Sequence, residues 1–306
     1  MRPSAPGRVP GMTDPYHGRV EELPWVDPAP RNGLLEVFRR RYLLRLLVRR
    51  EISARYSGSF LGLVWSYINP LSQFAIYFVV IGLFLRLHEN VPNFAIHMFC
   101  GIVLVHYFTE TFNAGTRSIV RNKAIVRKMA MPNEMFPVAS MLVSLYHVGP
   151  QVVILMLACL GYGWLPDLGG LLAVALALAI IMVLGTALAL LFSAANVFFR
   201  DWASFVNILS NFVRFSVPMI YPFSIVDERF GSVAPYYLFN PMANAVLLFQ
   251  RAFWVGTTDD PAELAKTDLP EHLYTRGFVM LGASLVILVI AQMVFTRLES
   301  KIPERI

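Results

Sequence analysis

The amino-acid sequence predicts an all-α, polytopic membrane protein, and composition and charge distribution are the two main reasons. Of its 306 residues, 56% are hydrophobic and only 15% are charged, whereas soluble domains carry about 25% charged residues. The mean hydropathy is +0.56. The 30 residues between Arg55 and Arg86 include no Asp, Glu, Lys or Arg, and an α-helix needs roughly 20 apolar residues to cross a bilayer. This stretch therefore predicts a first membrane span.

The N-terminal part of the chain predicts two further segments. Residues 1–32 contain seven prolines and no apolar periodicity, so we expect a disordered cytoplasmic tail. It is not a secretory signal, because no apolar core precedes a small-residue cleavage site. Residues 33–55 predict an amphipathic helix at the membrane interface. Arg41, Arg45 and Arg49 recur every four residues along one face of this helix, where they can bind anionic membrane lipid; a solvated basic helix is the alternative.

Windows without charge predict six membrane spans within residues 56–297, followed by a short cytoplasmic tail at 298–306. The prediction of the fifth span has the weakest support, because Arg214 interrupts its apolar sequence. It is included because an odd number of crossings would misplace the loops. The predicted spans are residues 56–85, 90–109, 135–166, 168–199, 202–226 and 277–296.

The distribution of positive charge predicts the orientation of these spans. Twenty Lys and Arg residues fall on the side of the two termini and five on the opposite side. Cytoplasmic loops carry the excess of Lys and Arg in membrane proteins. We therefore expect a multi-pass protein of the bacterial inner membrane with both termini in the cytoplasm.

Three sequence motifs carry a resemblance to a known family. They are Arg49-x-x-x-x-x-Arg-Tyr-x-Gly-Ser-x-Leu-Gly-x-x-Trp-x-x-x-Asn-Pro70, then Phe198-Phe-Arg-Asp-Trp202 with Pro218-Met-Ile-Tyr-Pro222, and then Asn240-Pro241 with Arg251 behind it. Together they resemble the membrane (permease) subunit of ABC exporters for O-antigen, teichoic acid and related polysaccharides.

This resemblance implies a function and a set of partners. It implies the transmembrane subunit of an ATP-driven exporter of a polyprenyl-diphosphate-linked polysaccharide. Such a subunit works as a homodimer with two copies of a separate ABC ATPase, and its outer gate helices would fall within residues 222–276. The ratio of 22 Arg to 4 Lys is typical of a GC-rich genome, which favours a cell-wall galactan as the polymer.

The sequence predicts no chemistry within this chain. It contains no Gly-x-x-x-x-Gly-Lys-Ser/Thr phosphate-binding loop, so we expect ATP and Mg²⁺ to be bound by the partner ATPase and no cofactor by this chain. It also lacks paired catalytic carboxylates and a nucleophile motif, so we do not expect an enzyme. Cys100 and Cys159 lie in apolar stretches and predict small buried hydrophobes, not metal ligands. No metal site and no nucleic-acid partner are expected.

Residues 117–134 predict the contact with the ATPase. The stretch from Arg117 to Pro132 carries five positive charges and no negative one, and the resemblance implies that it forms a coupling helix. A loop that only fixes the topology is the alternative. Exposed apolar side chains favour a contact, because they usually mark interaction sites. The predicted coupling residues are Arg121, Lys123, Ile125, Val126 and Met129.

The channel lining is predicted from an aromatic stripe and from two residues of the fifth span. Phe60, Tyr67, Phe74 and Phe78 fall within about 40° of one direction at 100° per residue, and aromatic faces stack on sugar rings. A packing or lipid-facing stripe is the alternative. The two further candidates are Arg214 and Tyr221. A charge inside a span needs a partner or water, and Glu110 is the intramembrane acid that could pair with Arg214. A buried or snorkelling arginine without a transport role is the alternative.

Two other functions remain open at this stage. An ABC exporter of drugs or small lipids would share the topology, although an aromatic content of 13% suits carbohydrate stacking better. A membrane-embedded glycosyltransferase would also handle a polyprenyl-linked sugar. It would need outer-loop acids at catalytic spacing, and the acids of the long outer loop are scattered.

Overall fold

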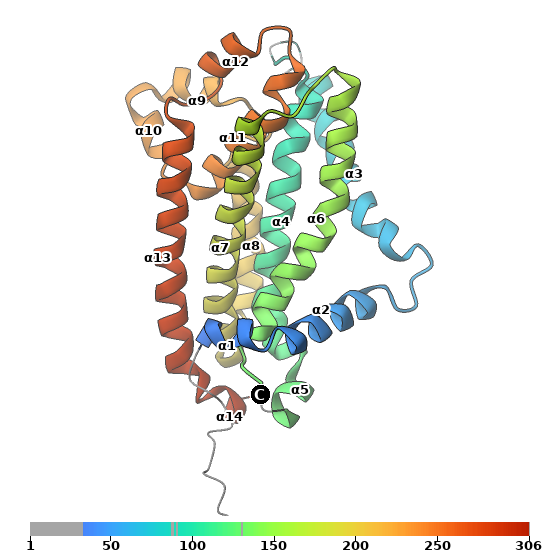
Figure 1. Cartoon of the computed structure of the whole chain (residues 1–306), viewed down its shortest axis with the longest axis vertical. Helices are drawn as coiled ribbons and strands as arrows, with labels where there is room; N and C mark the ends of the chain where they lie inside the picture. The colour runs from blue at the N-terminus through green and yellow to red at the C-terminus, as the bar shows by residue number, and fades with distance from the viewer. Residues whose placement is uncertain (1–32, 87–88, 90, 130, 306) are drawn as a thin grey trace, which may run out of the picture.

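The computed structural model describes residues 33–86, 89, 91–129 and 131–305. All regular secondary structure among these residues is helical, and the helices form one elongated bundle (Figure 1). The all-α prediction is confirmed. The tail predicted for residues 1–32 lies outside the described residues.

Five helices are long and apolar enough to cross a membrane, which confirms the polytopic membrane class. The first joins α3 to the π-helical turn η2, and the other four are continuous α-helices. Each spans at least 20 residues, so each reaches the roughly 30 Å of the hydrocarbon core. Their bounds are α3 Trp65–Tyr77 with η2 Phe78–Phe84, α4 Phe94–Arg121, α6 Met135–Gly161, α7 Leu168–Phe198 and α13 Leu273–Glu299.

The predicted fifth span at residues 202–226 is not one continuous helix. Helix α8 runs over Trp202–Phe215, which at 1.5 Å per residue is about 21 Å and too short to cross alone. Pro218 cannot donate a helical hydrogen bond and disfavours a helical residue before it. The next helix, α9, begins only at Phe223, after Pro222. Among the described residues there are thus five helices of spanning length where six spans were predicted.

The broken end of α8 is capped by side chains from the motifs around it. Tyr221 Oη donates to the carbonyl oxygen of Phe215 at 2.9 Å, and Asn240 Nδ2 donates to that of Ser216 at 3.0 Å. The last carbonyls of any helix lack partners within it, and inside a membrane protein those partners must come from the protein itself. Asn240 also caps the start of α11, because its Oδ1 accepts from the amide of Met242 at 2.9 Å.

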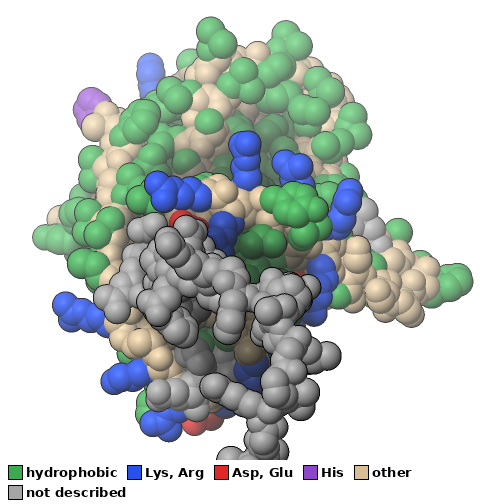
Figure 2. Space-filling model, turned by 60° about the horizontal axis from the view of Figure 1, so that its bottom comes forward, with side chains coloured by type: hydrophobic (Ala, Val, Ile, Leu, Met, Phe, Trp, Pro, Cys, Tyr) green, Lys and Arg blue, Asp and Glu red, His purple; other side chains and the backbone are tan. Residues whose placement is uncertain are grey.

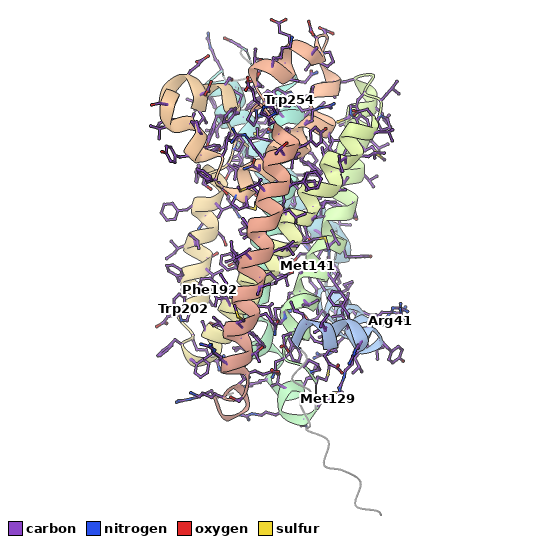
Figure 3. The ribbon with its side chains drawn as sticks, turned by 60° about the vertical axis from the view of Figure 1, so that its left-hand side comes forward. Arg41, Met129, Met141, Phe192, Trp202 and Trp254 are labelled. Atoms are coloured by element: carbon purple, nitrogen blue, oxygen red, sulfur yellow. The ribbon has the colours of Figure 1, made fainter. Side chains whose placement is uncertain are left out.

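The segment predicted as the outer gate region, residues 222–276, folds into short helices at one end of the bundle (Figure 1). We call this end the outer end, and the opposite end, which carries α5 and α14, the inner end. Figure 3 shows Trp254 at the outer end and Met129 at the inner end. The short helices are α9 Phe223–Phe230, η4 Gly231–Val233, α10 Ala234–Tyr237, α11 Pro241–Phe253, η5 Val255–Thr257 and α12 Pro261–Thr267.

Helix α11 is the buried centre of the outer end. Most of its residues are buried against α4, α7 and α13. Gln250 Nε2 donates to the carbonyl oxygen of Pro218 at 2.7 Å, which fixes the chain after the break in α8. Gly101 on α4 permits this close approach, since a Cβ there would lie 2.5 Å from Met219 Cγ.

The N-terminal segment differs from the prediction of one helix at residues 33–55. Helix α1 covers Gly33–Arg39, and α2 covers Arg41–Tyr56 after a break at Arg40. Helix α2 extends away from the bundle near its inner end (Figure 1). A turn and the short helix η1 Gly62–Val64 follow, so the first span begins at Trp65 and not at residue 56 as predicted. The C-terminal residues Ile302–Arg305 form α14 at the same end.

Candidate functional site

An open cavity of about 560 Å³ lies between α2, α4 and α6 near the inner end, and we call it the inner vestibule. Its wall is polar on α4, where Asn113 and Arg117 face it, and on α6, where Ser140 and Ser144 face it. Figure 2 shows Lys and Arg side chains gathered on this end of the molecule. The charged residues of the vestibule are Arg50, Glu51, Arg55, Glu110, Arg117 and Arg121.

The ion pairs of the vestibule leave positive charge uncompensated. Arg55 pairs with Glu110 at 2.5 Å, and Arg121 pairs with Glu51. Arg50 donates instead to the side-chain amide oxygen of Asn122 at 2.9 Å. Because four arginines face two glutamates, the cavity keeps a net positive charge that favours an anionic ligand.

A second cavity of about 240 Å³ adjoins the vestibule, and we call it the polar chamber. Arg55 and Glu110 line both cavities. Tyr56, at the end of α2, bonds to Ser66 Oγ at 2.6 Å and to His147 Nδ1 at 2.9 Å. These bonds join the end of α2 to α3 and α6. Polar contacts therefore connect the wall of the inner vestibule to the first span.

The predicted pairing of Arg214 with Glu110 is wrong. Glu110 is engaged by Arg55, and Arg214 forms no ion pair with any residue that the structure describes. Arg214 lies in the last turn of α8, half-buried, and its buried Nε lacks a hydrogen-bond partner. A cation in such a position normally faces water or a ligand, so a role in the conduit remains a prediction.

The predicted aromatic stripe is not one helical face. Phe60 is fully exposed in the turn before η1 and belongs to no helix, whereas Tyr67 is half-buried in α3. Phe74 and Phe78 stack on one another at 5.8 Å and pack against Phe99 and Phe94 of α4. In the single chain these two rings therefore face the neighbouring helix. Tyr221, as described above, caps the end of α8.

The comparisons with known proteins agree with this architecture. Residues 42–254 match the ABC-2 type transporter family, which is more than half of the chain. The chain belongs to the ABC-2 type transporter family. An O-antigen export system permease protein RfbA from Myxococcus xanthus is 28% identical over 229 residues, which cover 75% of this chain and 86% of that protein. Two proteins of the same name from Klebsiella pneumoniae are also similar. One is 26% identical over 70% of this chain and 81% of its own length. The other is 25% identical over 80% of this chain and 90% of its own length.

As a member of this family, the chain is the membrane subunit of a transporter, and its predicted coupling segment lies at the inner end. Arg117 and Arg121 belong to α4 and not to a loop as predicted, because α4 continues to Arg121. The short helix α5 follows at Lys123–Lys128. Ile125 and Val126 are half-buried against neighbouring hydrophobic residues. Of the three predicted apolar contact residues, Met129, at 50% exposure, is the one with a largely free apolar surface.

The predicted coupling segment of this ABC-2 transporter is joined to α13 by hydrogen bonds. Asn133 Nδ2 donates to Glu299 Oε1 at 3.1 Å, and Gln292 Nε2 donates to Glu134 Oε1 at 2.9 Å. A movement of this segment would therefore act on α13 through these two hydrogen bonds. Sequence reasoning missed this link because its partners are more than 150 residues apart.

Sequence reasoning also missed the pair of Arg55 and Glu110 and the chamber around His147. One signal was available, since Glu110 is an acid at the end of the predicted span 90–109, and an acid at such a position needs a partner. Arg55, at the end of the basic segment, was the other arginine that could have been predicted to pair with Glu110. Arg41, Arg45 and Arg49 are exposed on α2 as predicted for an interfacial helix.

Proposed function

We propose that this chain is the transmembrane subunit of an ATP-driven exporter that moves a polyprenyl-diphosphate-linked polysaccharide across the bacterial inner membrane. The observation that carries the proposal is the inner vestibule, where four arginines face two glutamates. A diphosphate is a compact anion, and arginine binds phosphate oxygens bidentately. The relatives named O-antigen export permeases support a polysaccharide as the cargo.

The position of the vestibule suits a lipid-linked substrate. It opens between α2, which extends away from the bundle, and the spans α4 and α6. A polyprenyl chain can stay in the bilayer while its diphosphate enters the vestibule. The glycan would then follow through the conduit, and a cell-wall galactan is the polymer that we propose.

We propose further that two copies of this chain work with two copies of a separate ABC ATPase, which binds ATP and Mg²⁺. One bundle of five spanning helices is filled by its own core, whereas two copies can enclose a wide channel. Helix α8 supports such a pairing with an exposed apolar face, formed by Phe205, Ile208, Phe212 and Phe215. The first and last described helices, α1 and α14, lie at the inner end with α5 (Figure 1), and we propose that both termini lie in the cytoplasm.

Depletion of the protein in its native host tests the proposed cargo. We expect the lipid-linked glycan to accumulate on the inner leaflet, where an impermeant glycosidase reaches it in inverted vesicles but not in right-side-out vesicles. A complemented strain is the control. If glycan synthesis stops instead, a glycosyltransferase is favoured; if the glycan still reaches the outer leaflet, the export proposal is wrong.

Met129→Asp tests the proposed ATPase contact. A charge in place of an exposed apolar side chain would be left unpaired at an apolar contact, so we expect ATPase activity to persist while export falls about tenfold, equivalent to 1.4 kcal/mol. Met129→Leu keeps the apolar surface and serves as the control. A simultaneous substitution of Ile125 would be a less specific test, because Ile125 also packs against buried residues of the bundle and its loss would affect stability. Normal export by Met129→Asp would place the ATPase contact elsewhere.

A further inference from the structure

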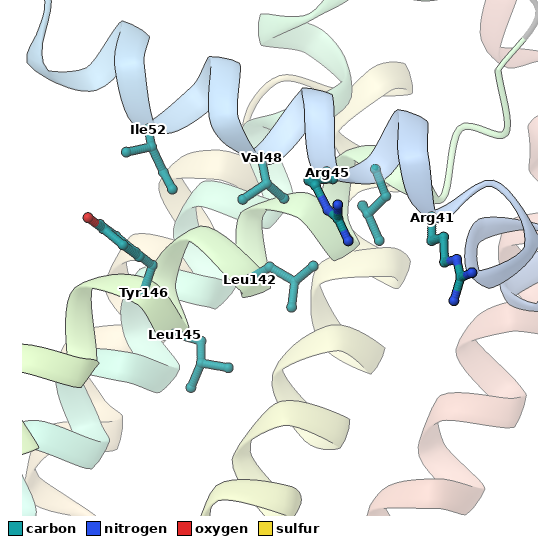
Figure 4. Close-up of a pocket in the computed structure, with 8 residues that line it drawn as sticks. Arg41, Arg45, Val48, Ile52, Leu142, Leu145 and Tyr146 are labelled. Atoms are coloured by element: carbon teal, nitrogen blue, oxygen red, sulfur yellow. The ribbon is translucent and has the colours of Figure 1, made fainter.

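A groove of about 440 Å³ lies between α2 and α6, separate from the inner vestibule. Its walls are apolar along most of their length, with two arginines at one end (Figure 4). The lining residues are Arg41, Leu44, Arg45, Val48, Ile52, Leu142, Leu145 and Tyr146.

The groove and the vestibule lie on opposite faces of α6. Ser140, Val143 and Ser144 line the vestibule, whereas residues 142, 145 and 146 line the groove. At 100° per residue the mean directions of these two sets are about 160° apart. The groove therefore opens on the side of α6 that faces away from α4 and from the polar cavities.

The outward face of α6 continues beyond the groove as an apolar stripe. Tyr146, Val153 and Leu157 are exposed on this face and follow one another at helical spacing within about 40°. Since α6 is long and apolar enough to cross a membrane, this exposed stripe is suited to contact with hydrocarbon. An acyl chain entering the groove would run along it.

The two arginines supply a charge at the end of this apolar track. Arg41 and Arg45 lie one turn apart on α2 and share a helical face with Val48 and Ile52, and Figure 4 shows all four side chains on the same side of α2. Neither forms an ion pair with a described residue. Arg50 and Arg55 of the same helix, by contrast, are bonded to Asn122 and Glu110.

We propose that this groove is a binding site for one anionic phospholipid, distinct from the transported lipid. Arg41 and Arg45 bind its phosphate, and Leu142, Leu145 and Tyr146 bind an acyl chain. Charge complementarity and the apolar track together require a molecule that is anionic at one end and a hydrocarbon at the other. A lipid seated there fills the space between α2 and the bundle and so stabilises the position of α2 over the first span.

Native mass spectrometry of the purified full chain, with phosphatidylglycerol or phosphatidylcholine added to the micelles, tests the site. We expect retention of one phosphatidylglycerol in preference to phosphatidylcholine. The double variant Arg41→Gln with Arg45→Gln should lose about 30-fold in phosphatidylglycerol affinity. That factor corresponds to about 2 kcal/mol, the sum for two cations at an anionic lipid surface.

Two further variants make the result decisive. Arg39→Gln with Arg297→Gln removes the same charge from exposed positions outside the groove and should change the affinity less than threefold. Leu145→Trp fills the apolar track and should weaken lipid retention with both arginines in place. Equal retention of the two lipids by the unmodified protein, equal losses in the two double variants, or unchanged binding by Leu145→Trp would each overturn the proposal.

Discussion

The two ends of the bundle satisfy their polar groups in different ways. At the inner end, charged side chains pair with one another, as Arg55 does with Glu110. At the outer end, Arg251 of α11 pairs with Asp167 at the start of α7, but the broken helix α8 depends on neutral side chains: Tyr221 and Asn240 bond to its last backbone carbonyls. A charged side chain that pairs with another side chain can bind a ligand instead. A side chain that bonds to a backbone carbonyl stabilises the fold.

The difference follows from where the backbone is interrupted. Along the inner vestibule, residues 110–121 belong to α4 and residues 140–144 to α6, so most of their backbone groups are satisfied within the helix and their side chains are available to each other or to a ligand. At the outer end α8 stops after 14 residues, and its terminal carbonyls need donors from elsewhere. Substitutions at the inner end should therefore change substrate binding and export, and substitutions at the outer end should change stability.

Arg55→Gln should have the largest effect. It removes the partner of Glu110 and a cation that lines both inner cavities. Loss of one member of a hydrogen-bonded charge pair costs about 2 kcal/mol at the low end of the range for buried pairs, which suits a partly exposed pair. We expect export by reconstituted vesicles to fall about 30-fold.

The double variant Arg55→Gln with Glu110→Gln separates the two roles of Arg55. It also removes the Glu110 carboxylate that Arg55→Gln leaves without a partner, so expression and membrane insertion should be normal. Export should stay low, because the cation that faces the diphosphate is still missing. Recovery of full export would show that Arg55 acts only by neutralising Glu110.

Arg117→Gln should affect export without affecting stability. Arg117 lines the vestibule and is exposed, and it forms no ion pair among the residues that the structure describes. We expect about a fivefold higher substrate concentration for half-maximal export, equivalent to about 1 kcal/mol, with the free energy of unfolding unchanged within about 0.5 kcal/mol. Arg297→Gln, an exposed arginine of α13 outside the vestibule, is the control.

The charge-free windows predicted three of the membrane helices well. Helices α6, α7 and α13 begin or end within a few residues of the prediction, because a bilayer imposes a minimum apolar length. Helix α4 was predicted to end at residue 109 but continues to Arg121. Its polar inner turns line a protein cavity and not lipid, so hydropathy alone could not find its end.

The candidate site was less predictable, because its geometry depends on contacts between distant segments. Arg55 and Glu110 are 55 residues apart, and nothing in their spacing favours this pair over Arg214 with Glu110. Phe60 was placed on the first span by helical spacing, but the helix begins only at Trp65. The turn at residues 57–61 interrupts the periodicity on which that prediction depended.

Asn240→Ala should produce the largest loss of stability at the outer end. It removes the donor to Ser216 and the N-terminal cap of α11 together. Replacement of a capping Asn by Ala costs about 1 to 2 kcal/mol, so thermal unfolding in detergent should begin a few degrees lower. Asn207→Ala, on the exposed part of α8, should leave the unfolding temperature unchanged; an equal shift in both variants would contradict the capping role.

Tyr221→Phe should have the smallest effect and gives the sharpest test of the difference between the two ends. It removes only the hydroxyl that donates to Phe215 and that lies 3.3 Å from the hydroxyl of Tyr237. A lost hydrogen bond costs about 1 kcal/mol, so we expect a slightly lower unfolding temperature and export within twofold of the unmodified protein. Tyr236→Phe, an exposed tyrosine of α10, is the matched control. If Tyr221→Phe instead abolishes export while the unfolding temperature stays the same, its hydroxyl contacts the substrate, and Tyr221 is a channel residue as the sequence predicted.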